Sequence, residues 1–266
     1  MLVLLLIRVA AIQMLIGGDL EANLERARKH ISTAVMQGAE FVCLPEYFSY
    51  SPNLSSFKDL IEGYKKTRTM LKKQSARNKI CLVGGSVLRP VNSKIYNSTL
   101  VFNSGRHIAT ADKLHPTRGE KENGIRPGSK KTIFKAKGII CGILICADIL
   151  FPQHLWSLRK NGIQLLFVPL VSPVRSIDYT QKRRDTLFIS RAFDLNAYVI
   201  KTGSIGIAPG ERSVVGRSLI ASPADILIKA KSEEQEEILI ANLEIESLKN
   251  MDLLASMFDF ADTKLS

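Results

Sequence analysis

Short runs of branched and aromatic residues alternate with amphipathic segments along the whole chain, and this alternation limits the fold more than any other feature. Runs of strand length extend from Arg8 to Met14, from Glu40 to Leu44, from Ile80 to Leu88 and from Ile139 to Cys146. Longer segments between them have apolar residues at helical spacing. Strands and helices of this kind must bury one face against each other, so the sequence predicts a layered α/β or α+β sandwich.

Four helices are predicted. Asp19 is a suitable N-cap for the first, and apolar residues recur at helical spacing from Leu20 until Gly38. The other three helices are expected at Ser56 to Asn78, Pro152 to Asn161 and Asp178 to Asp194. Further strands are expected at Tyr96 to Asn103, His107 to Ala111, Thr132 to Lys135, Ile163 to Pro169, Ala197 to Thr202, Ser213 to Ala221, Ile226 to Lys231 and Glu237 to Leu243. The polar segment from Asp112 to Lys131 is predicted to be a long loop.

No linker-like composition and no internal repeat divides the chain, so we expect a single domain over residues 1–266. Residues 1–7 are an apolar leader of uncertain role. Arg8 interrupts this run far short of the roughly 20 apolar residues that a membrane span requires, so no membrane partner is expected; a short membrane-associating tail is the alternative. Four cysteines without a paired spacing indicate a reducing compartment, and we expect a cytoplasmic protein.

The formal net charge of +12 raises nucleic acid as a partner. The densest basic groups, from Lys65 to Lys73 and from Lys130 to Lys137, have no interleaved aromatic residues on which bases would stack. We therefore expect solvated basic surfaces and no nucleic-acid partner.

Three polar residues with complementary chemistry follow predicted strands. Glu46 follows the run that ends at Leu44, Lys113 follows the strand that ends at Ala111, and Cys146 ends the run GIICGILIC. The end of a strand exposes a side chain while the backbone stays rigid, so these three groups are candidates for one convergent site.

The segments around these residues resemble the nitrilase, or carbon–nitrogen hydrolase, superfamily. The resemblance rests on LPE (Leu44 to Glu46), KLHPTRGE (Lys113 to Glu120) and ICADILFP (Ile145 to Pro152), in that family's order. Flanking segments such as YNSTLVF (Tyr96 to Phe102) and RAFDLNAYVI (Arg191 to Ile200) extend the similarity over nearly the whole chain after residue 7. The resemblance implies a four-layer αββα sandwich, a homodimer or larger homo-oligomer, a Glu-Lys-Cys triad and no cofactor or metal.

Carried onto this sequence, the resemblance makes Cys146 the nucleophile, Glu46 the general base and Lys113 the cation beside them. Glu120 matches a second glutamate that supports the site, and the backbone N–H of Ala147 would hold the oxyanion. The predicted reaction converts a small carboxamide, through a thioester on the cysteine, into a carboxylic acid and ammonia or an amine. Whether the cysteine pKa is raised or lowered cannot be read from the sequence, because the glutamate and the lysine act in opposite directions.

Other interpretations assign these residues structural roles. Cys43, Cys81 and Cys141 are expected to be core residues, and Asp148 is expected to anchor the turn after the nucleophile. His115 would suit a Cys-His protease, but that hypothesis leaves Glu46 and Lys113 unexplained, so we take it as a hydrogen-bonding residue of the loop.

The substrate is left open by the sequence. Leu170 and Val171 predict an apolar wall that disfavours a carbamoyl or carboxylate group near the reacting centre, and Arg175 is a candidate for gripping a substrate carboxylate. The alternatives to a small-amide hydrolase are an N-carbamoyl-amide hydrolase, a nitrilase, a catalytically silent binding protein with the same fold and a basic nucleic-acid-binding module.

Overall fold

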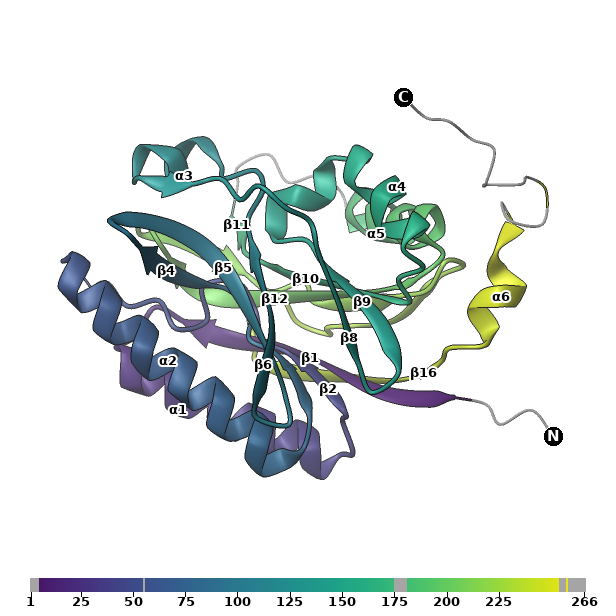
Figure 1. The fold of residues 1–266 in the computed structure, drawn as a ribbon, viewed down its shortest axis with the longest axis horizontal. Coiled ribbons are helices and arrows are strands. Elements are labelled where there is room, and N and C mark those ends of the chain that lie inside the picture. Colours follow the sequence, from purple (N-terminus) through teal and green to yellow (C-terminus); the bar gives the residue numbers. More distant parts are fainter. Residues whose placement is uncertain (1–4, 55, 175–180, 254–256, 258–266) are drawn as a thin grey trace.

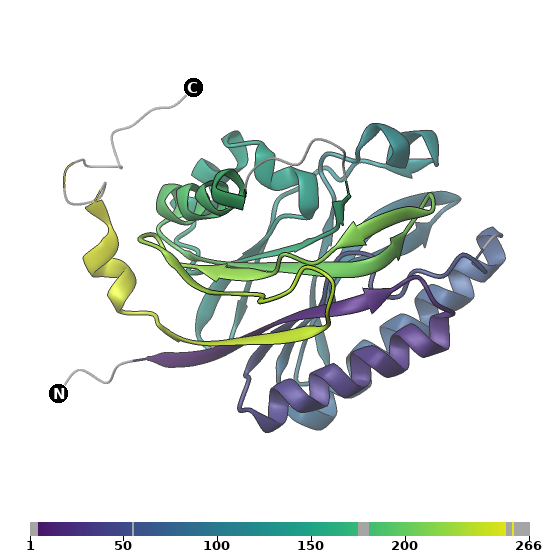
Figure 2. The same cartoon turned by 180° about the vertical axis from the view of Figure 1, so that it is seen from behind.

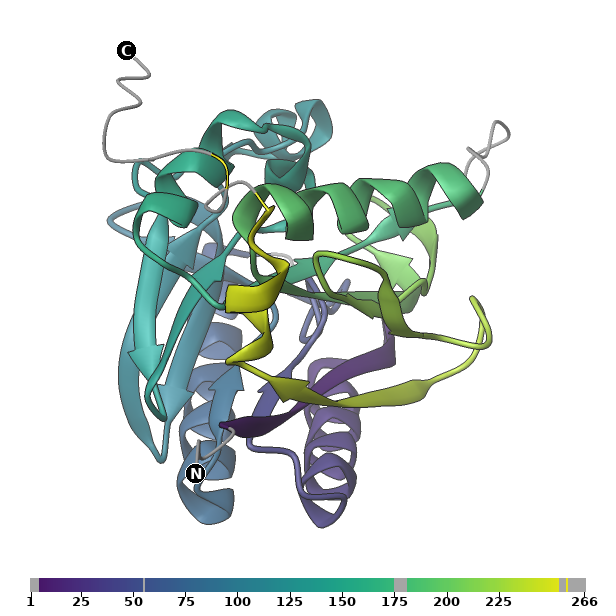
Figure 3. The same cartoon turned by 90° about the vertical axis from the view of Figure 1, so that its right-hand side faces the viewer.

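The structure is a computed structural model that describes residues 5–54, 56–174, 181–253 and 257. Two sheets lie face to face, and a pair of helices covers the outer face of each (Figures 1 and 3). Helices α1 (Leu20–Met36) and α2 (Phe57–Asn78) cover the first sheet, and α4 (Gln153–Lys160) and α5 (Gln181–Leu195) cover the second. This is the predicted four-layer αββα sandwich.

The first sheet is built around the N-terminal strand. Its members are β1 (Leu6–Ile16), β2 (Phe41–Cys43), β3 (Cys81–Val83), β4 (Val87–Val91), β5 (Lys94–Asn103), β6 (Arg106–Asp112), β7 (Ile125–Arg126) and β16 (Glu237–Glu244). Strands β1, β2 and β3 are parallel neighbours. Strand β16 runs antiparallel along the other edge of β1, so the first described strand and the last one lie side by side (Figure 2).

The second sheet contains the later strands. Its members are β8 (Thr132–Ala136), β9 (Ile139–Ile143), β10 (Leu165–Leu170), β12 (Tyr198–Ala208), β14 (Leu219–Ala221) and β15 (Ile226–Lys229). The short strands β11 (Ser172–Pro173) and β13 (Arg212–Val215) extend it beside the end of β12. The two sheets join where Met14 of β1 pairs in parallel with Ser204 of β12.

Three apolar layers hold the sandwich together. The layer between the sheets includes Phe41 and Phe167, the layer under α1 and α2 includes Leu71, and the layer under α4 and α5 includes Phe188. Each strand serves two layers because successive side chains point to opposite faces.

Helix starts follow the predicted local signals. Asp19 caps α1 by accepting a hydrogen bond from the N–H of Ala22, as expected. Ser56 and Asp59 form a capping box that starts α2. The expected start of α5 at Asp178 lies outside the described residues.

Several predicted boundaries are wrong, each for a local reason. The strand expected from Ile80 to Leu88 is two strands, because Gly84 and Gly85 interrupt it. The one expected from Ser213 to Ala221 breaks where Arg217 has a φ of 98°. The loop from Asp112 to Lys131 contains helix α3 (Arg118–Glu122) and strand β7. Leu6 and Ile7, assigned to the apolar leader, belong to β1 because they pair with β16.

Candidate active site

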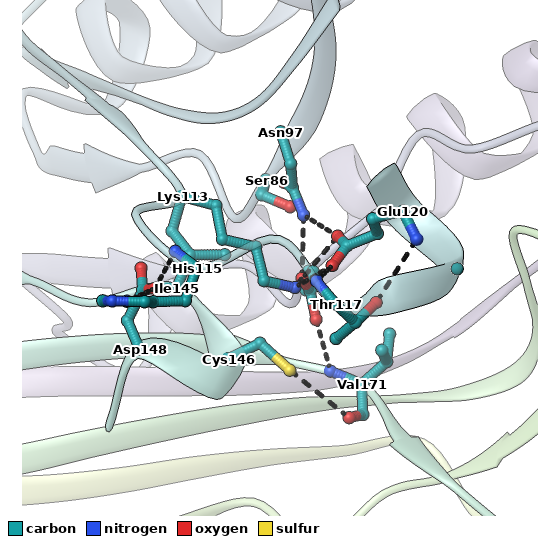
Figure 4. A network of polar contacts seen from close by, with 12 residues as sticks. Ser86, Asn97, Lys113, His115, Thr117, Glu120, Ile145, Cys146, Asp148 and Val171 are labelled. Carbon is teal, nitrogen blue, oxygen red and sulfur yellow. Dashed lines mark hydrogen bonds and ion pairs between the residues drawn. The ribbon is translucent and has the colours of Figure 1, made fainter. Parts of the chain in front are cut away.

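The three predicted reactive residues each lie just beyond a strand, and the fold brings them together. Figure 4 shows Lys113 and Cys146 with the polar contacts around them. Glu46 follows β2, Lys113 directly follows β6, and Cys146 follows β9. The side chains of Glu46 and Lys113 are 0% and 1% exposed. Convergence from three separate strand ends is the arrangement that the sequence predicted.

The turn that carries Glu46 depends on Gly85, which lies in the break between β3 and β4. Gly85 has a φ of +53°, and a Cβ at this position would lie 2.1 Å from the carbonyl oxygen of Pro45. The N–H of Ser86 donates to that same oxygen at 3.2 Å, and its hydroxyl accepts from the N–H of Tyr47. The break between β3 and β4 therefore holds the Pro45–Glu46 turn in place.

Glu46 accepts three hydrogen bonds, which leaves one acceptor site on Oε2. Its Oε1 accepts from Lys113 Nζ at 2.9 Å and from Asn97 Nδ2 at 2.8 Å, and its Oε2 accepts from the backbone N–H of Val171 at 2.9 Å. A buried carboxylate requires such partners to remain charged. These bonds also fix the orientation of the carboxylate.

Glu120 is the second acid of the cluster. Helix α3 presents it through a capping box with Thr117, whose N–H donates to its Oε2 at 2.7 Å. Its Oε1 accepts from Lys113 Nζ at 2.9 Å and from the Tyr47 hydroxyl at 2.5 Å. Burial alone would raise the pKa of Glu120, but its contacts with Lys113 and Tyr47 lower the pKa to about 2. Glu120 is thus ionised beside the lysine.

Cys146 has an unusual backbone conformation. Strand β9 ends at Ile143, and Cys146 begins the 3₁₀ helix η1 (Cys146–Leu150) with a φ of +51°. The strand therefore breaks before the cysteine and not after it, which corrects the predicted boundary. The left-handed turn aims Sγ at the carbonyl oxygen of Val171, 3.8 Å away (Figure 4). Ala147 follows and is half-buried.

The charges around the thiol have a clear net effect. Burial is the largest cause and the Glu46 carboxylate the next, and together they outweigh Lys113 and raise the pKa of Cys146 to about 12. For Lys113, burial lowers the pKa, but Glu46 and the other acidic groups reverse this and raise it above its ordinary value. The resting state at neutral pH is a neutral thiol beside a charged lysine, which answers the question that the sequence left open.

Asp148 connects the lysine loop to the cysteine turn. Its carboxylate accepts from the backbone N–H groups of Leu114, His115 and Ile145 at 3.0, 2.7 and 3.2 Å. The His115 ring lies against Asp148 and stacks on Phe151 at 3.7 Å between ring centroids. Both residues lie where their predicted structural roles require.

Three groups that hydrogen-bond the site carboxylates were not predicted from the sequence. The first is Asn97, within the segment YNSTLVF, whose amide donates to both Glu46 and Glu120, the latter at 2.9 Å. A polar residue at a buried position of β5 was the available signal. Tyr47 and the N–H of Val171 carried no such signal, because their roles depend on distant segments.

A cavity of about 310 Å³ opens beside the thiol. We call it the thiol cavity; its lining includes Lys113, Glu120, Cys146, Ala147, Leu150, Leu170, Val171, Arg184, Leu187, Phe188, Lys201 and Arg212. A larger hollow of about 620 Å³, near Trp156 and Asp252, contains none of the predicted site residues. The thiol cavity has the size and mixed lining of a small-molecule site.

Other features of the described chain bear on ligands and surroundings. Over these residues, no group of three or more His, Cys, Asp or Glu side chains is arranged to hold a metal ion. No helix among them has the length and apolar character needed to cross a membrane. Arg175, the candidate for gripping a carboxylate, lies outside the described residues.

Sequence comparison relates the chain to enzymes with amide substrates. Omega-amidase NIT2 of Xenopus tropicalis is 28% identical over 252 residues, covering 91% of this chain and 90% of that protein. Deaminated glutathione amidase of Synechocystis is 27% identical over 258 residues, covering 91% and 93%. The chain is thus similar to these proteins over nearly its full length.

Structural comparison gives the same fold. A carbon–nitrogen hydrolase from Helicobacter pylori superposes with a TM-score of 0.83 at 20% identity, over 94% of this chain and 93% of that one. Nit3 of Saccharomyces cerevisiae, a member of the nitrilase superfamily, gives a TM-score of 0.79 at 25% identity and covers 97% of both chains. The sequence model of the carbon–nitrogen hydrolase family matches residues 8–252. The chain therefore belongs to the carbon–nitrogen hydrolase family.

Proposed function

We propose that this protein is an amidase that hydrolyses the C–N bond of a small linear carboxamide to a carboxylic acid and ammonia. The observation that carries the proposal is the meeting of Cys146, Glu46 and Lys113 beside a cavity of about 310 Å³. A poorly electrophilic amide carbon requires a soft nucleophile, a proton acceptor and a stabilised oxyanion, and this site offers a group for each task. The amidase names of the similar proteins support the same reaction class.

In the first half-reaction Glu46 takes the thiol proton of Cys146 while Sγ attacks the amide carbon. Since the pKa of Cys146 is raised to about 12, proton removal accompanies attack and does not precede it. The Lys113 ammonium and the N–H of Ala147 stabilise the oxyanion. The C–N bond then breaks as Glu46 gives its proton to the leaving nitrogen, which leaves a thioester on the sulfur.

In the second half-reaction water attacks the thioester carbon and gives a proton to Glu46. The C–S bond breaks, the acid leaves, and the proton returns to the sulfur, so the enzyme is restored with its atoms in balance. Glu120 does not exchange protons in this scheme; its low pKa keeps it ionised to hold Lys113 in place.

The assembly and location remain part of the proposal. We infer a single domain over residues 1–266, supported by the family match over residues 8–252. A homodimer or larger homo-oligomer is supported by exposed aromatic residues on the outer helices, Trp156 of α4 at 40% and Phe193 of α5 at 36%. Four free cysteines in the chain support the cytoplasm as its compartment.

The test is ammonia release by the purified protein from short aliphatic amides, ω-amides of dicarboxylic acids, N-carbamoyl amino acids and nitriles. Turnover of an amide that disappears in Cys146→Ala supports the proposal. Preference for the carbamoyl compounds or the nitriles would replace amidase by one of those activities. Absence of turnover and of an acyl adduct in the intact mass would favour a silent binding protein.

A further inference from the structure

Lys201 is a buried lysine that the proposed mechanism does not use. It lies within β12, and the residue is 3% exposed. Its Nζ lies 4.7 Å from the centroid of the Phe188 ring on α5. Within the part of the chain that the structure describes, this nitrogen has no hydrogen-bond acceptor and no carboxylate within ion-pair distance.

The surroundings of Lys201 disfavour a protonated amine. Lysine is almost never fully buried without a partner, and the face of an aromatic ring replaces only part of the lost hydration. The guanidinium groups of Arg184 and Arg217 add repulsion to this burial, and together they lower the pKa of Lys201 to about 7. At pH 8 the side chain is therefore mostly an uncharged primary amine.

The nearby carboxylates do not cancel this repulsion. Asp185 and Glu233 attract a positive charge on Lys201, but more weakly than the two arginines repel it. Asp185 pairs with Lys229 at 3.2 Å, and Glu233 pairs with Arg184 at 3.0 Å. The electrostatic potential at the end of the Lys201 side chain is therefore positive, and an anionic group is more stable there than a cationic one.

The amine also has room for a small added group. Lys201 lines the thiol cavity of about 310 Å³, beside the apolar side chains of Leu187 and Phe188. In the parallel pair of β10 and β12, Lys201 lies opposite Val168, three residues before Val171, whose carbonyl contacts the thiol. Three strand residues correspond to roughly 10 Å between the backbone positions, so the amine belongs to a part of the cavity away from the sulfur.

Carbon dioxide is the reactant that suits this amine. Only the unprotonated form of lysine is a nucleophile, and at pH 8 a lysine with a pKa of about 7 has roughly 300-fold more of that form than an ordinary lysine at 10.5. Carbon dioxide is small and uncharged, so it enters a partly apolar cavity at little cost. The carbamate that it forms is an anion, as the positive potential favours, whereas an imine stays basic and an amide is neutral.

We propose that Nζ of Lys201 is a site of reversible carboxylation, at which carbon dioxide forms a lysine carbamate inside the thiol cavity, in the field of Arg184 and Arg217. The nitrogen lone pair attacks the carbon of carbon dioxide, one C–O π pair moves onto oxygen, and the nitrogen gives a proton to solvent. The product is N–COO⁻ and one released proton, and no atom is oxidised or reduced. The proposal goes beyond the amidase function and does not depend on it.

The experiment detects the carbamate directly. Purified protein at pH 8 is moved from a buffer free of carbon dioxide into isotopically labelled bicarbonate and observed by carbon NMR. The carbamate is then trapped with an ethyl oxonium reagent and located by peptide mass mapping. We expect a carbamate signal and an ethoxycarbonyl group on Lys201, both lost in Lys201→Met. Lys229→Met, which removes a neighbouring exposed lysine, should keep both.

The α-amino group of the purified chain provides an internal reference. Its ordinary pKa of roughly 8 lets it form a carbamate as well, so a second signal should persist in the wild type and in both variants. This signal shows that labelled carbon dioxide was present and that the method detects a carbamate.

A second measurement uses stability. In the unfolded chain Lys201 is an ordinary protonated lysine at pH 8, so carbon dioxide reacts mainly with the folded state and stabilises it. The urea midpoint of the wild type should rise with bicarbonate concentration, relative to acetate of the same ionic strength. The midpoint of Lys201→Met should be the same in the two salts.

Three results would overturn the proposal. The first is the α-amino signal without any signal that depends on Lys201, in protein whose urea transition shows that it is folded. The second is an ethoxycarbonyl group spread evenly over exposed lysines. The third is a higher urea midpoint without a trapped group, which would indicate that bicarbonate binds as an ion. Amide turnover and the Cys146→Ala variant test the amidase proposal separately, because none of these readouts involves the thiol.

Discussion

Lys113 donates to Oε1 of Glu46 at 2.9 Å, in an ion pair whose side chains are at most 1% exposed. Removing two charges from water is costly, so such a pair is stable only when further hydrogen bonds satisfy both groups. Here Lys113 also bonds Glu120, and Glu46 also bonds Asn97 and the N–H of Val171. The site is therefore rigid before any substrate binds, which is what positioning a proton acceptor requires.

Replacing the lysine should destabilise the fold as well as the reaction. Lys113→Met leaves two buried carboxylates facing each other without a cation, and we expect a loss of about 3–5 kcal/mol in the free energy of unfolding. Urea denaturation measures this loss. Arg89→Met is the matched control, because the Arg89–Asp112 pair is more exposed, with side chains 19% and 26% accessible. Equal losses in the two variants would contradict the assigned burial penalty.

Replacing the cysteine should remove activity without harming the fold. Cys146→Ala should lower kcat by at least about 1000-fold, since no other described side chain in the site replaces the thiol. With its pKa raised to about 12, the wild-type thiol should react with iodoacetamide about tenfold faster per pH unit from pH 8 to 10. Mass mapping of the adduct measures both effects, with buried Cys81→Ala as the control. A rate that levels off near pH 7 would mean that the thiolate already exists there.

Glu120 should contribute a pH-dependent part of stability. Its pKa falls from 4.5 in the unfolded chain to about 2 in the fold, so its contribution is complete above pH 4.5 and is lost as pH falls toward 2. Glu120→Gln should lower the free energy of unfolding by a few kcal/mol at pH 6 and by much less at pH 2.5. Chemical denaturation at the two pH values gives the difference. An equal effect at both would show that the carboxylate charge does not matter.

Asp148 should act as a positioning residue. The two carboxylate oxygens of Asp148 accept hydrogen bonds from three backbone N–H groups. In Asp148→Asn an NH₂ group takes the place of one oxygen and faces these donors, so we expect the free energy of unfolding to fall by about 2–4 kcal/mol. Because these bonds hold the lysine loop against the cysteine turn, kcat should fall about 10- to 100-fold while KM changes little. Asp225→Asn, on an exposed turn, is the control. A change in KM alone would contradict the positioning role.

Lys201 should destabilise the empty protein in a pH-dependent way. Its folded pKa of about 7 lies below the unfolded value of 10.5, so the unfolded state binds more protons between these values and stability rises with pH across that window. Below pH 7 the penalty is complete, and Lys201→Met should be more stable than the wild type by a few kcal/mol. The gap should close toward pH 10.5 in urea titrations, whereas that for Lys229→Met should stay constant. A Lys201→Met protein that is less stable at pH 6 would mean that the ammonium has a partner.

The residue pattern of the sequence by itself determined a layered sandwich of strands and helices, the Asp19 cap of α1 and the helix α2, and it singled out Glu46, Lys113 and Cys146 as residues that follow strands; the four-layer αββα arrangement and the choice of Glu120 came from the resemblance to the nitrilase superfamily. These features are local: a cap, a helical period or a residue after a strand depends on its own neighbours along the chain. Asp148 and the three core cysteines were recognised for the same reason.

Only the tertiary structure decided how these groups are held and what they face. The N–H of Val171 donates to Glu46 although the two residues are 125 positions apart in the sequence. Gly85 leaves room for the carbonyl oxygen of Pro45, forty positions earlier, because it has no Cβ. The left-handed turn at Cys146 and the segment from Arg118 to Arg126 depend on the loops packed against them. In the sequence, Lys201 is only a polar residue within a predicted strand. Its meaning comes from burial against Phe188 and from the cavity it shares with the thiol, because charge balance in a protein interior is set by neighbours in space.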